Sequence, residues 1–204
     1  MQEEPRIVIA VPLATPLIYW QTVASILELE KPEESDLMVF QGALVDRARN
    51  ILVEKMLDHP IHPTHIFFVD ADILLSPNAL MQLLAADKPV VSGVYRRRLP
   101  PHEPMAFIKN KPISLGKKRG LQKVDVVGGG CLLIRREVFE KVKAPWFTIE
   151  STTRGYLSED FSFCEKAFKK GFTVFVDTRV TPLHIEPMGV GTNAKGTVSL
   201  ASLT

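Results

Sequence analysis

Apolar residues along the chain gather in short runs that polar, proline-rich segments separate. Runs rich in β-branched and aromatic residues predict buried strands at 6–11, 37–40, 65–69, 89–95, 123–127, 131–134, 146–149 and 172–176. Apolar residues at helical spacing, with start and stop signals, predict helices at 16–29, 77–86, 136–142 and 161–170, and within 41–58. Strands that alternate with helices indicate an α/β fold with a central, mostly parallel sheet flanked by helices.

Length and composition fit one domain with a sizeable core. Of the 204 residues, 46% are hydrophobic and 24% are charged, and no repeat or low-complexity linker divides them. We expect a single domain over 1–187 and a Gly-, Ser- and Thr-rich tail over 188–204 that is flexible without ligand. The proline-rich segment 99–120 predicts a long surface excursion with a hairpin at about 105–113.

Charge and cysteine content narrow the partners and the compartment. A net charge of +2 lacks the global basic field of a dedicated DNA-binding protein. Cys131 and Cys164 lie in apolar settings, as expected for buried free thiols in a reducing compartment. The acidic start of the chain does not resemble a signal peptide, and no apolar run is long enough to span a bilayer. We therefore expect a cytoplasmic protein without membrane contact.

The predicted strand 65–69 is apolar on both faces and ends abruptly in Asp70 and Asp72. Open α/β sheets bind their ligands at such carboxyl ends. Along an extended strand the two carboxylates point the same way, and two oxygen ligands suit Mg²⁺ or Mn²⁺. An Asp at this place is also typical of a turn or a helix N-cap. Ser76 followed by Pro77 is the better cap, however, so we favour a metal or phosphate site.

Further polar residues follow other predicted strands. The loop 12–16 follows the first strand, where a nucleotide base can rest. Arg49 lies near the start of its helix, where it is either solvated or able to bind a diphosphate. The arginines 96–98 end another strand, where they bind an anion or form a solvated edge. The glycines 128–130 indicate close backbone approach to a ligand.

The C-terminal third adds two acids and a histidine. Ser158 predicts an N-cap, and Glu159 and Asp160 then either complement the helix dipole or supply a general base. His184 is either a structural histidine or a metal ligand, and its place after a strand favours the ligand. The histidines at 59, 62 and 65 do not predict a metal site, because the intervening prolines prevent a helix that would align them.

Taken together, these residues resemble a glycosyltransferase of the GT-A (Rossmann-like) fold, similar to family 2. Four motifs occur in the family's order along nearly the whole chain: Asp70-Ala71-Asp72 as the D-x-D signature, the Gly129-Gly130 loop, Ser158-Glu159-Asp160, and His184.

The resemblance implies a role for each residue. Asp70, Asp72 and His184 would bind Mn²⁺ or Mg²⁺ with the diphosphate of a nucleotide-sugar donor, such as a UDP- or GDP-sugar. The donor would also contact Pro12, Leu13, Ala14, Arg49, Ala71, Gly129 and Gly130. Asp160, assisted by Glu159, would deprotonate an acceptor hydroxyl in an inverting reaction, and the tail could close over the donor.

Other functions stay open at this point. The Asp pair also occurs in nucleotidyltransferases and phosphatases, although the residues around it fit those classes less well. A non-catalytic module that binds sugar nucleotides is a third possibility. The acceptor is not identified by the sequence. The basic pieces 96–98 and 117–119 would suit an anionic acceptor such as a nucleic acid, but charge runs are usually solvated.

Overall fold

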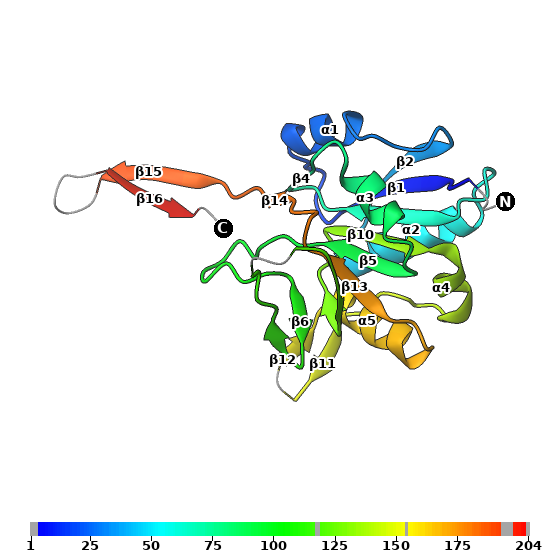
Figure 1. The fold of residues 1–204 in the computed structure, drawn as a ribbon. Coiled ribbons are helices and arrows are strands. Elements are labelled where there is room, and N and C mark those ends of the chain that lie inside the picture. The colour runs from blue at the N-terminus through cyan, green and yellow to red at the C-terminus, as the bar shows by residue number, and fades with distance from the viewer. Residues whose placement is uncertain (1–3, 117–118, 154, 193–197, 203–204) are drawn as a thin grey trace.

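The computed structural model describes residues 4–116, 119–153, 155–192 and 198–202. A seven-stranded sheet with the order β2-β1-β3-β10-β5-β13-β8 forms its centre (Figure 1). The strands are β1 Ile7–Leu13, β2 Ser35–Gln41, β3 His65–Val69, β5 Val90–Gly93, β8 Leu121–Val124, β10 Cys131–Arg135 and β13 Val174–Asp177. Only β10 and β8 run against the other strands of this sheet. The expected α/β class with a mostly parallel sheet is confirmed.

Helices cover both faces of the sheet. α1 (Trp20–Leu27) and α3 (Ala79–Ala85) pack on one face, and α2 (Val45–Leu57), α4 (Arg136–Lys141) and α5 (Glu159–Lys169) on the other. Because side chains alternate along a strand, β1 sends Val8 and Ala10 to the second face and Ile7 and Ile9 to the first. Each face therefore has its own apolar core. Among the described helices, none is long and apolar enough to cross a membrane.

Smaller sheets of two or three strands form outside the central sheet. They pair β4 (Ile73–Leu74) with β14 (Leu183–His184), β6 (Ala106–Ile108) with β7 (Lys111–Pro112) and β9 (Val126–Val127), β11 (Glu150–Thr152) with β12 (Gly155–Leu157), and β15 (Met188–Thr192) with β16 (Val198–Ser202). The hairpin predicted near 105–113 is confirmed. Residues 193–197 and 203–204 of the predicted tail, and 117–118 of the basic segment, lie outside the described residues.

Several local predictions are wrong in their bounds, and three of them concern the segments next to the site. β1 does not stop at Pro12 but continues to Leu13, because β3 pairs with β1 only as far as Ala10 and so leaves that side free for a residue without an N–H. α1 begins only at Trp20. α3 begins at Ala79 with Asn78 as N-cap, because Ser76 donates to the Asn78 side chain and does not cap the helix.

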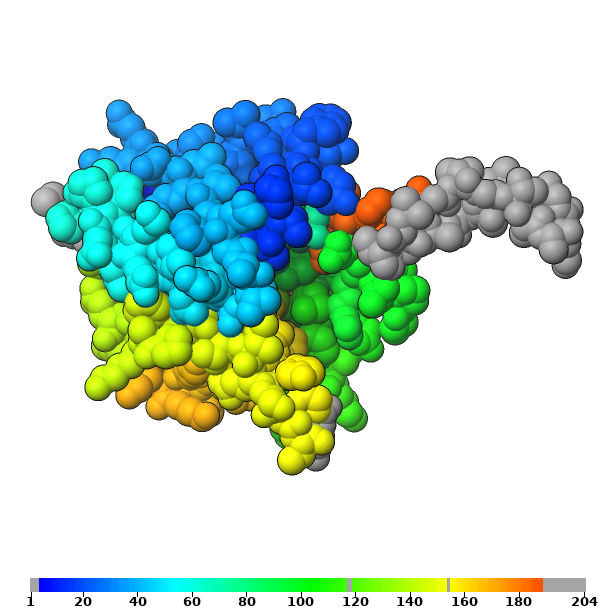
Figure 2. Space-filling model, turned by 180° about the vertical axis from the view of Figure 1, so that it is seen from behind, coloured from blue at the N-terminus to red at the C-terminus, as the bar shows by residue number. Residues whose placement is uncertain are grey.

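The strand predicted at 146–149 is absent, because Asn50 engages its backbone. Asn50 Oδ1 accepts hydrogen bonds from the N–H groups of Trp146 (2.9 Å) and Phe147 (3.1 Å), and Asn50 Nδ2 donates to the Phe147 carbonyl (2.7 Å). The Phe147 ring then stacks on Phe163 of α5, with centroids 4.7 Å apart. α2 and the chain before α5 are thereby joined. Figure 2 shows the N-terminal segments, in blue and cyan, lying on the C-terminal ones, in yellow and orange.

Candidate functional site

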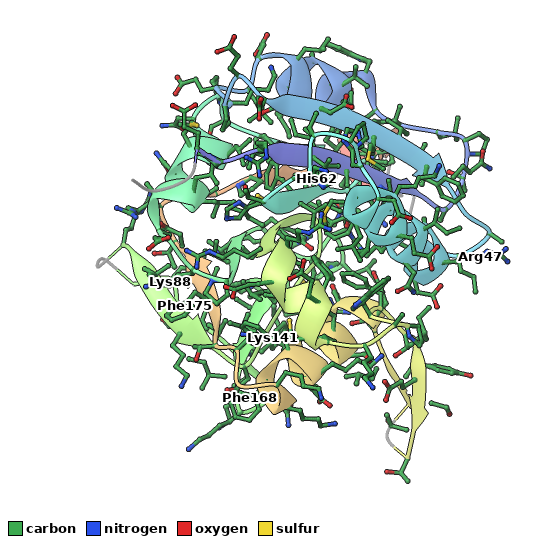
Figure 3. All side chains as sticks on the ribbon, turned by 90° about the vertical axis from the view of Figure 1, so that its right-hand side faces the viewer. Arg47, His62, Lys88, Lys141, Phe168 and Phe175 are labelled. Carbon is green, nitrogen blue, oxygen red and sulfur yellow. The ribbon has the colours of Figure 1, made fainter. Side chains whose placement is uncertain are left out.

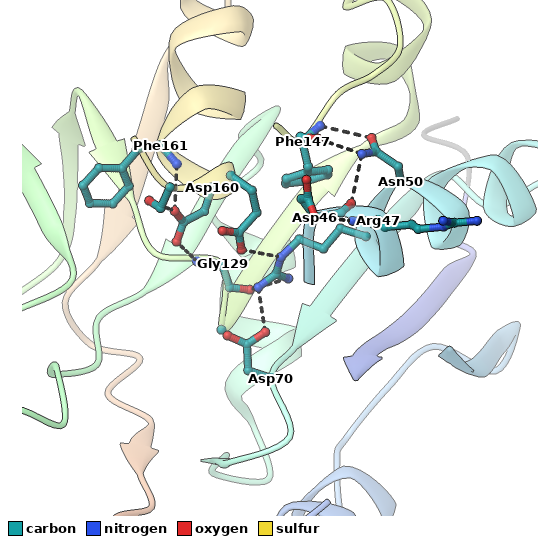
Figure 4. A network of polar contacts seen from close by, with 12 residues as sticks. Asp46, Arg47, Asn50, Asp70, Gly129, Phe147, Asp160 and Phe161 are labelled. Atoms are coloured by element: carbon teal, nitrogen blue, oxygen red, sulfur yellow. Dashed lines mark hydrogen bonds and ion pairs between the residues drawn. The ribbon is translucent and has the colours of Figure 1, made fainter. Parts of the chain in front are cut away.

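Four chain segments meet at one edge of the central sheet. Because β10 runs antiparallel to β3, with Cys131 opposite Val69, the residues before β10 lie beside the residues after β3. The Asp70 N–H donates to the Gly130 carbonyl (3.2 Å) across this junction. Arg49 on α2 and Glu159 at the start of α5 reach the same place, where Arg49 contacts both Glu159 and Asp70. Figure 4 shows Asp70, Gly129 and Asp160 gathered there.

Arg49 is the centre of this site. Its side chain is 1% exposed, and its guanidinium donates to Asp70 Oδ1 (2.7 Å), Glu159 Oε1 (3.2 Å) and the Gly129 carbonyl (3.3 Å). The guanidinium carbon also lies 5.2 Å from the centroid of the Phe68 ring. A buried charge is tolerated only when it is paired and hydrogen bonded, and these contacts satisfy both conditions.

The charges of this cluster compensate one another. Burial alone would lower the pKa of Arg49, but the carboxylates of Asp70 and Glu159 outweigh it and raise that pKa. Burial raises the pKa of Asp70, and Arg49 partly opposes the rise. By contrast, Arg47 is exposed and points away from the body of the protein (Figure 3). Arg49, which the sequence left open between solvent and a site, is therefore buried in the site.

The three glycines make room for the protein's own side chains. A Cβ at Gly129 would lie 2.7 Å from Arg49 Nη2, and one at Gly130 would lie 3.0 Å from the ring of Tyr95. A Cβ at Gly128 would overlap the Tyr95 hydroxyl, which accepts a hydrogen bond from the Gly130 N–H (3.0 Å). Close approach to the glycine backbone does occur, but the approaching groups are Arg49 and Tyr95. The approach of a ligand, which the sequence predicted, stays a prediction.

Asp160 lies against the same glycine loop. Its carboxylate accepts hydrogen bonds from the backbone N–H groups of Gly129 (3.0 Å) and Phe161 (2.8 Å) and from the Ser158 hydroxyl. Ser158 thus occupies the N-cap position, as predicted, but its hydroxyl binds Asp160 instead of capping the helix. Burial, and then the charge of Glu159, raise the pKa of Asp160 to about 6. A carboxyl group with this pKa is suited to accept a proton near neutral pH.

The two acids of the D-x-D segment do not share partners. β3 ends at Val69, and the Ile73 N–H donates to the Asp70 carbonyl (3.2 Å), which closes a turn over the two acids. The expectation that both point the same way along an extended strand is therefore wrong, because Asp70 binds Arg49 whereas Asp72 faces His184.

Asp72 and His184 form the second part of the site. The pairing of β14 with β4 sets His184 beside the turn, and its Nε2 lies 3.3 Å from Asp72 Oδ2. Arg98 Nη1 lies 3.3 Å from the same oxygen. Burial opposes ionisation of Asp72, but the contacts with His184 and Arg98 prevail and lower its pKa. Burial likewise lowers the pKa of His184, but Asp72 and the Arg96 carbonyl outweigh it and raise that pKa.

The donor set at Asp72 fits a hard divalent cation. His184 Nδ1 lies 2.9 Å from the Arg96 carbonyl, which can only accept, so Nδ1 carries a proton. Nε2 can then donate to Asp72 when the ring is protonated, and it can bind a cation when the ring is neutral. Holding one ring nitrogen in this way is typical of metal-binding histidines. No group of three or more His, Cys, Asp or Glu side chains able to hold a metal occurs in the described part of the chain. Water or ligand oxygens would have to complete the coordination.

The structure places the remaining predicted residues less centrally. Pro12 and Leu13 are buried within β1, and Ala14 is exposed at its end. The Tyr19 N–H donates to the Ala71 carbonyl (3.0 Å), so the segment after Ala14 returns to the D-x-D turn. Tyr95 also belongs to the site, since its hydroxyl binds the Gly130 N–H, and its position at the end of a predicted strand is the signal in the sequence that points to it.

Several solved structures share this fold. A197 from STIV is 16% identical over 96% of this chain and 93% of its own, with a TM-score of 0.65. GalNAc-T7, solved with UDP, GalNAc and Mn²⁺, is 16% identical over 90% of this chain and 44% of its own (TM-score 0.63). S. aureus TarS 1–349, solved with UDP-GlcNAc, is 12% identical over 90% and 59% (TM-score 0.54). No protein-family model and no curated protein sequence matches the chain.

GalNAc-T7 and TarS are glycosyltransferases of the GT-A fold. This chain therefore has a GT-A-like fold, which confirms the expectation from the order of its motifs. The narrower resemblance to family 2 is not confirmed. Because the chain spans less than two thirds of either glycosyltransferase, and identity is low, the likeness establishes the fold alone.

We predict that Gly129→Ala destabilises the protein by about 2–4 kcal/mol, because the added methyl group displaces the buried guanidinium of Arg49 from its carboxylates. Gly116→Ala is the matched control, since a Cβ there meets no atom within 4 Å. Urea denaturation measures both. Equal free energies of unfolding for the two variants would refute the packing role assigned to Gly129.

Proposed function

We propose that this protein is a glycosyltransferase that moves a sugar from a nucleotide-sugar donor to a hydroxyl group of an acceptor. One observation carries the proposal. The described residues gather Arg49, Asp70, Glu159 and Asp160, with Asp72 and His184 beside them, at the ligand-binding edge of a GT-A-like sheet. UDP-sugars are the first donors to test, since the structures of GalNAc-T7 and TarS contain UDP and UDP-GlcNAc respectively.

Asp72 and His184 are the residues that would hold Mn²⁺ or Mg²⁺ with the donor, and Asp70 would assist through a bridging water. Such a cation supplies Lewis-acid stabilisation of the negative charge on a departing nucleoside diphosphate. The contact between Asp70 and Arg49 fixes the turn that carries Asp72. The hairpin of β15 and β16 follows His184 closely along the chain, and we propose that the tail 188–204 covers the donor and excludes water.

Asp160 is the general base in this proposal. It takes the proton of the acceptor hydroxyl as the new glycosidic bond forms, and an inverting reaction needs one such base. The hydrogen bond from the Gly129 N–H fixes its carboxylate next to the Arg49 cluster. Glu159 contributes by holding Arg49, so its role is to position the site.

We predict that one nucleoside diphosphate or its sugar raises the melting temperature in the presence of Mn²⁺. A ligand at a hundredfold its Kd adds about 2.7 kcal/mol to stability, which corresponds to roughly 5–10 °C for a chain of this size. Asp72→Ala should lose the Mn²⁺-dependent part of the shift. The control Asp87→Ala, which removes an exposed carboxylate, should keep it. The proposal fails if no nucleotide or nucleotide sugar stabilises the wild type with Mn²⁺ present.

We predict that slow hydrolysis of the donor so identified requires ionised Asp160. Because folding raises its pKa from 3.8 to about 6, the active carboxylate form is lost as pH falls through 6, and the rate then drops about tenfold per pH unit. Because the pKa of Asp160 is higher in the folded state, ionised Asp160 destabilises the fold, and its protonation below pH 6 removes that cost. Acidification therefore does not unfold the protein through Asp160, and the loss of rate reports the loss of its carboxylate form. Release of nucleoside diphosphate measures the rate.

Asp160→Asn should lower that rate about 10²–10⁴-fold and leave donor binding intact. Asp87→Asn should change neither. If Asp160→Asn hydrolyses the donor like the wild type, Asp160 is not the base. If the wild type binds the donor but never turns it over with any acceptor, the protein is a binding module.

A further inference from the structure

The carboxylate of Asp72 already has a cation beside it. Arg98 Nη1 and His184 Nε2 both lie 3.3 Å from Asp72 Oδ2, and the Asp72 and His184 side chains are each only 18% exposed. The Arg96 carbonyl holds the ring of His184 so that Nε2 faces that oxygen. A carboxylate that is largely removed from solvent needs a positive charge beside it, and the guanidinium of Arg98 supplies one.

The backbone that carries Arg98 is fixed, whereas its side chain has space to move. Residues 95–105 form a loop closed by the Met105 N–H to the Tyr95 carbonyl (2.8 Å) and by the Arg97 N–H to the Glu103 carbonyl (2.9 Å). Arg98 directly follows Arg97, the donor of the second of these hydrogen bonds, and its side chain is 38% exposed. Beside it lies a cavity of about 360 Å³ lined by Tyr95, Arg97, Arg98, Leu99, Met105 and His184. The Arg98 side chain can turn into this cavity while both backbone hydrogen bonds stay intact.

We propose that Arg98 and a divalent cation are alternative partners of Asp72, so that the cation binds only by displacing the guanidinium. A cation bound to Asp72 Oδ2 would share with Nη1 of Arg98 the oxygen that Nη1 now contacts at 3.3 Å, and two positive charges on one oxygen would repel each other. The displaced guanidinium then enters the cavity, where it can contact the diphosphate of the donor. The identity of the cation rests on the proposed function.

Direct binding of Mn²⁺, followed by the loss of the free-ion signal in electron paramagnetic resonance, tests the exchange without nucleotide. Arg98→Ala should bind Mn²⁺ about fivefold more tightly than the wild type, because no resident cation has to be displaced. Arg98→Lys keeps the charge and should stay within about twofold of the wild type. Arg97→Ala is the matched control, since it removes one charge from the same cavity without a contact to Asp72. Asp72→Ala should lose the site.

The exchange is refuted if Arg98→Ala binds Mn²⁺ no more tightly than Arg97→Ala, because the effect would then be one of net charge. It is also refuted if Arg98→Ala binds Mn²⁺ more weakly than the wild type, since Arg98 would then support the metal. If neither the wild type nor Arg98→Ala binds Mn²⁺, the exchange fails, while donor binding without metal would preserve the glycosyltransferase proposal. Melting temperatures of all variants confirm that each protein is folded.

Discussion

The buried guanidinium of Arg49 is the interaction on which the site depends. It connects residues far apart in the sequence: Asp70 at the end of β3, Gly129 before β10 and Glu159 at the start of α5. Removing a single partner from such a cluster leaves a buried charge unpaired, at a cost of about 3–5 kcal/mol. The cluster thus constrains how the segments that carry Arg49 and Asp70 meet the segments that carry Gly129 and Glu159. It also fixes these polar groups without a ligand.

The rest of the site follows from this constraint. The antiparallel course of β10 brings the glycine loop to the edge where the parallel strands β1 and β3 end. Because Gly128, Gly129 and Gly130 have no side chains, the side chains of Arg49 and Tyr95 can pack against their backbone. Asp160 is hydrogen bonded to this loop, and Asp72 lies in the turn after β3 in contact with His184. In the proposed function, Asp160 is the base, and Asp72 with His184 hold the cation; sugar transfer from a nucleotide uses both groups.

Much of this arrangement could be predicted from local pattern. A buried strand that ends in two acids, a glycine triplet and an acidic helix start can each be recognised in the sequence, and all three lie at the site. Contacts between residues far apart in the sequence could not be predicted. Arg47 and Arg49 lie two residues apart, and the contacts of Arg49 with partners 21, 80 and 110 residues away determine that it is the buried one. The turn over Asp70 and Asp72 and the contact between Arg98 and Asp72 also depend on tertiary pairing that no local pattern encodes.

The most direct test of this account is a double-mutant cycle between Arg49 and Glu159, with Arg49→Met, Glu159→Gln and the double variant measured by urea denaturation. If the guanidinium of Arg49 holds α2 against the start of α5, the two substitutions are coupled by about 1–3 kcal/mol. The double variant then loses less free energy of unfolding than the two single variants lose together. Free energies that add within about 0.5 kcal/mol would contradict the central role of Arg49.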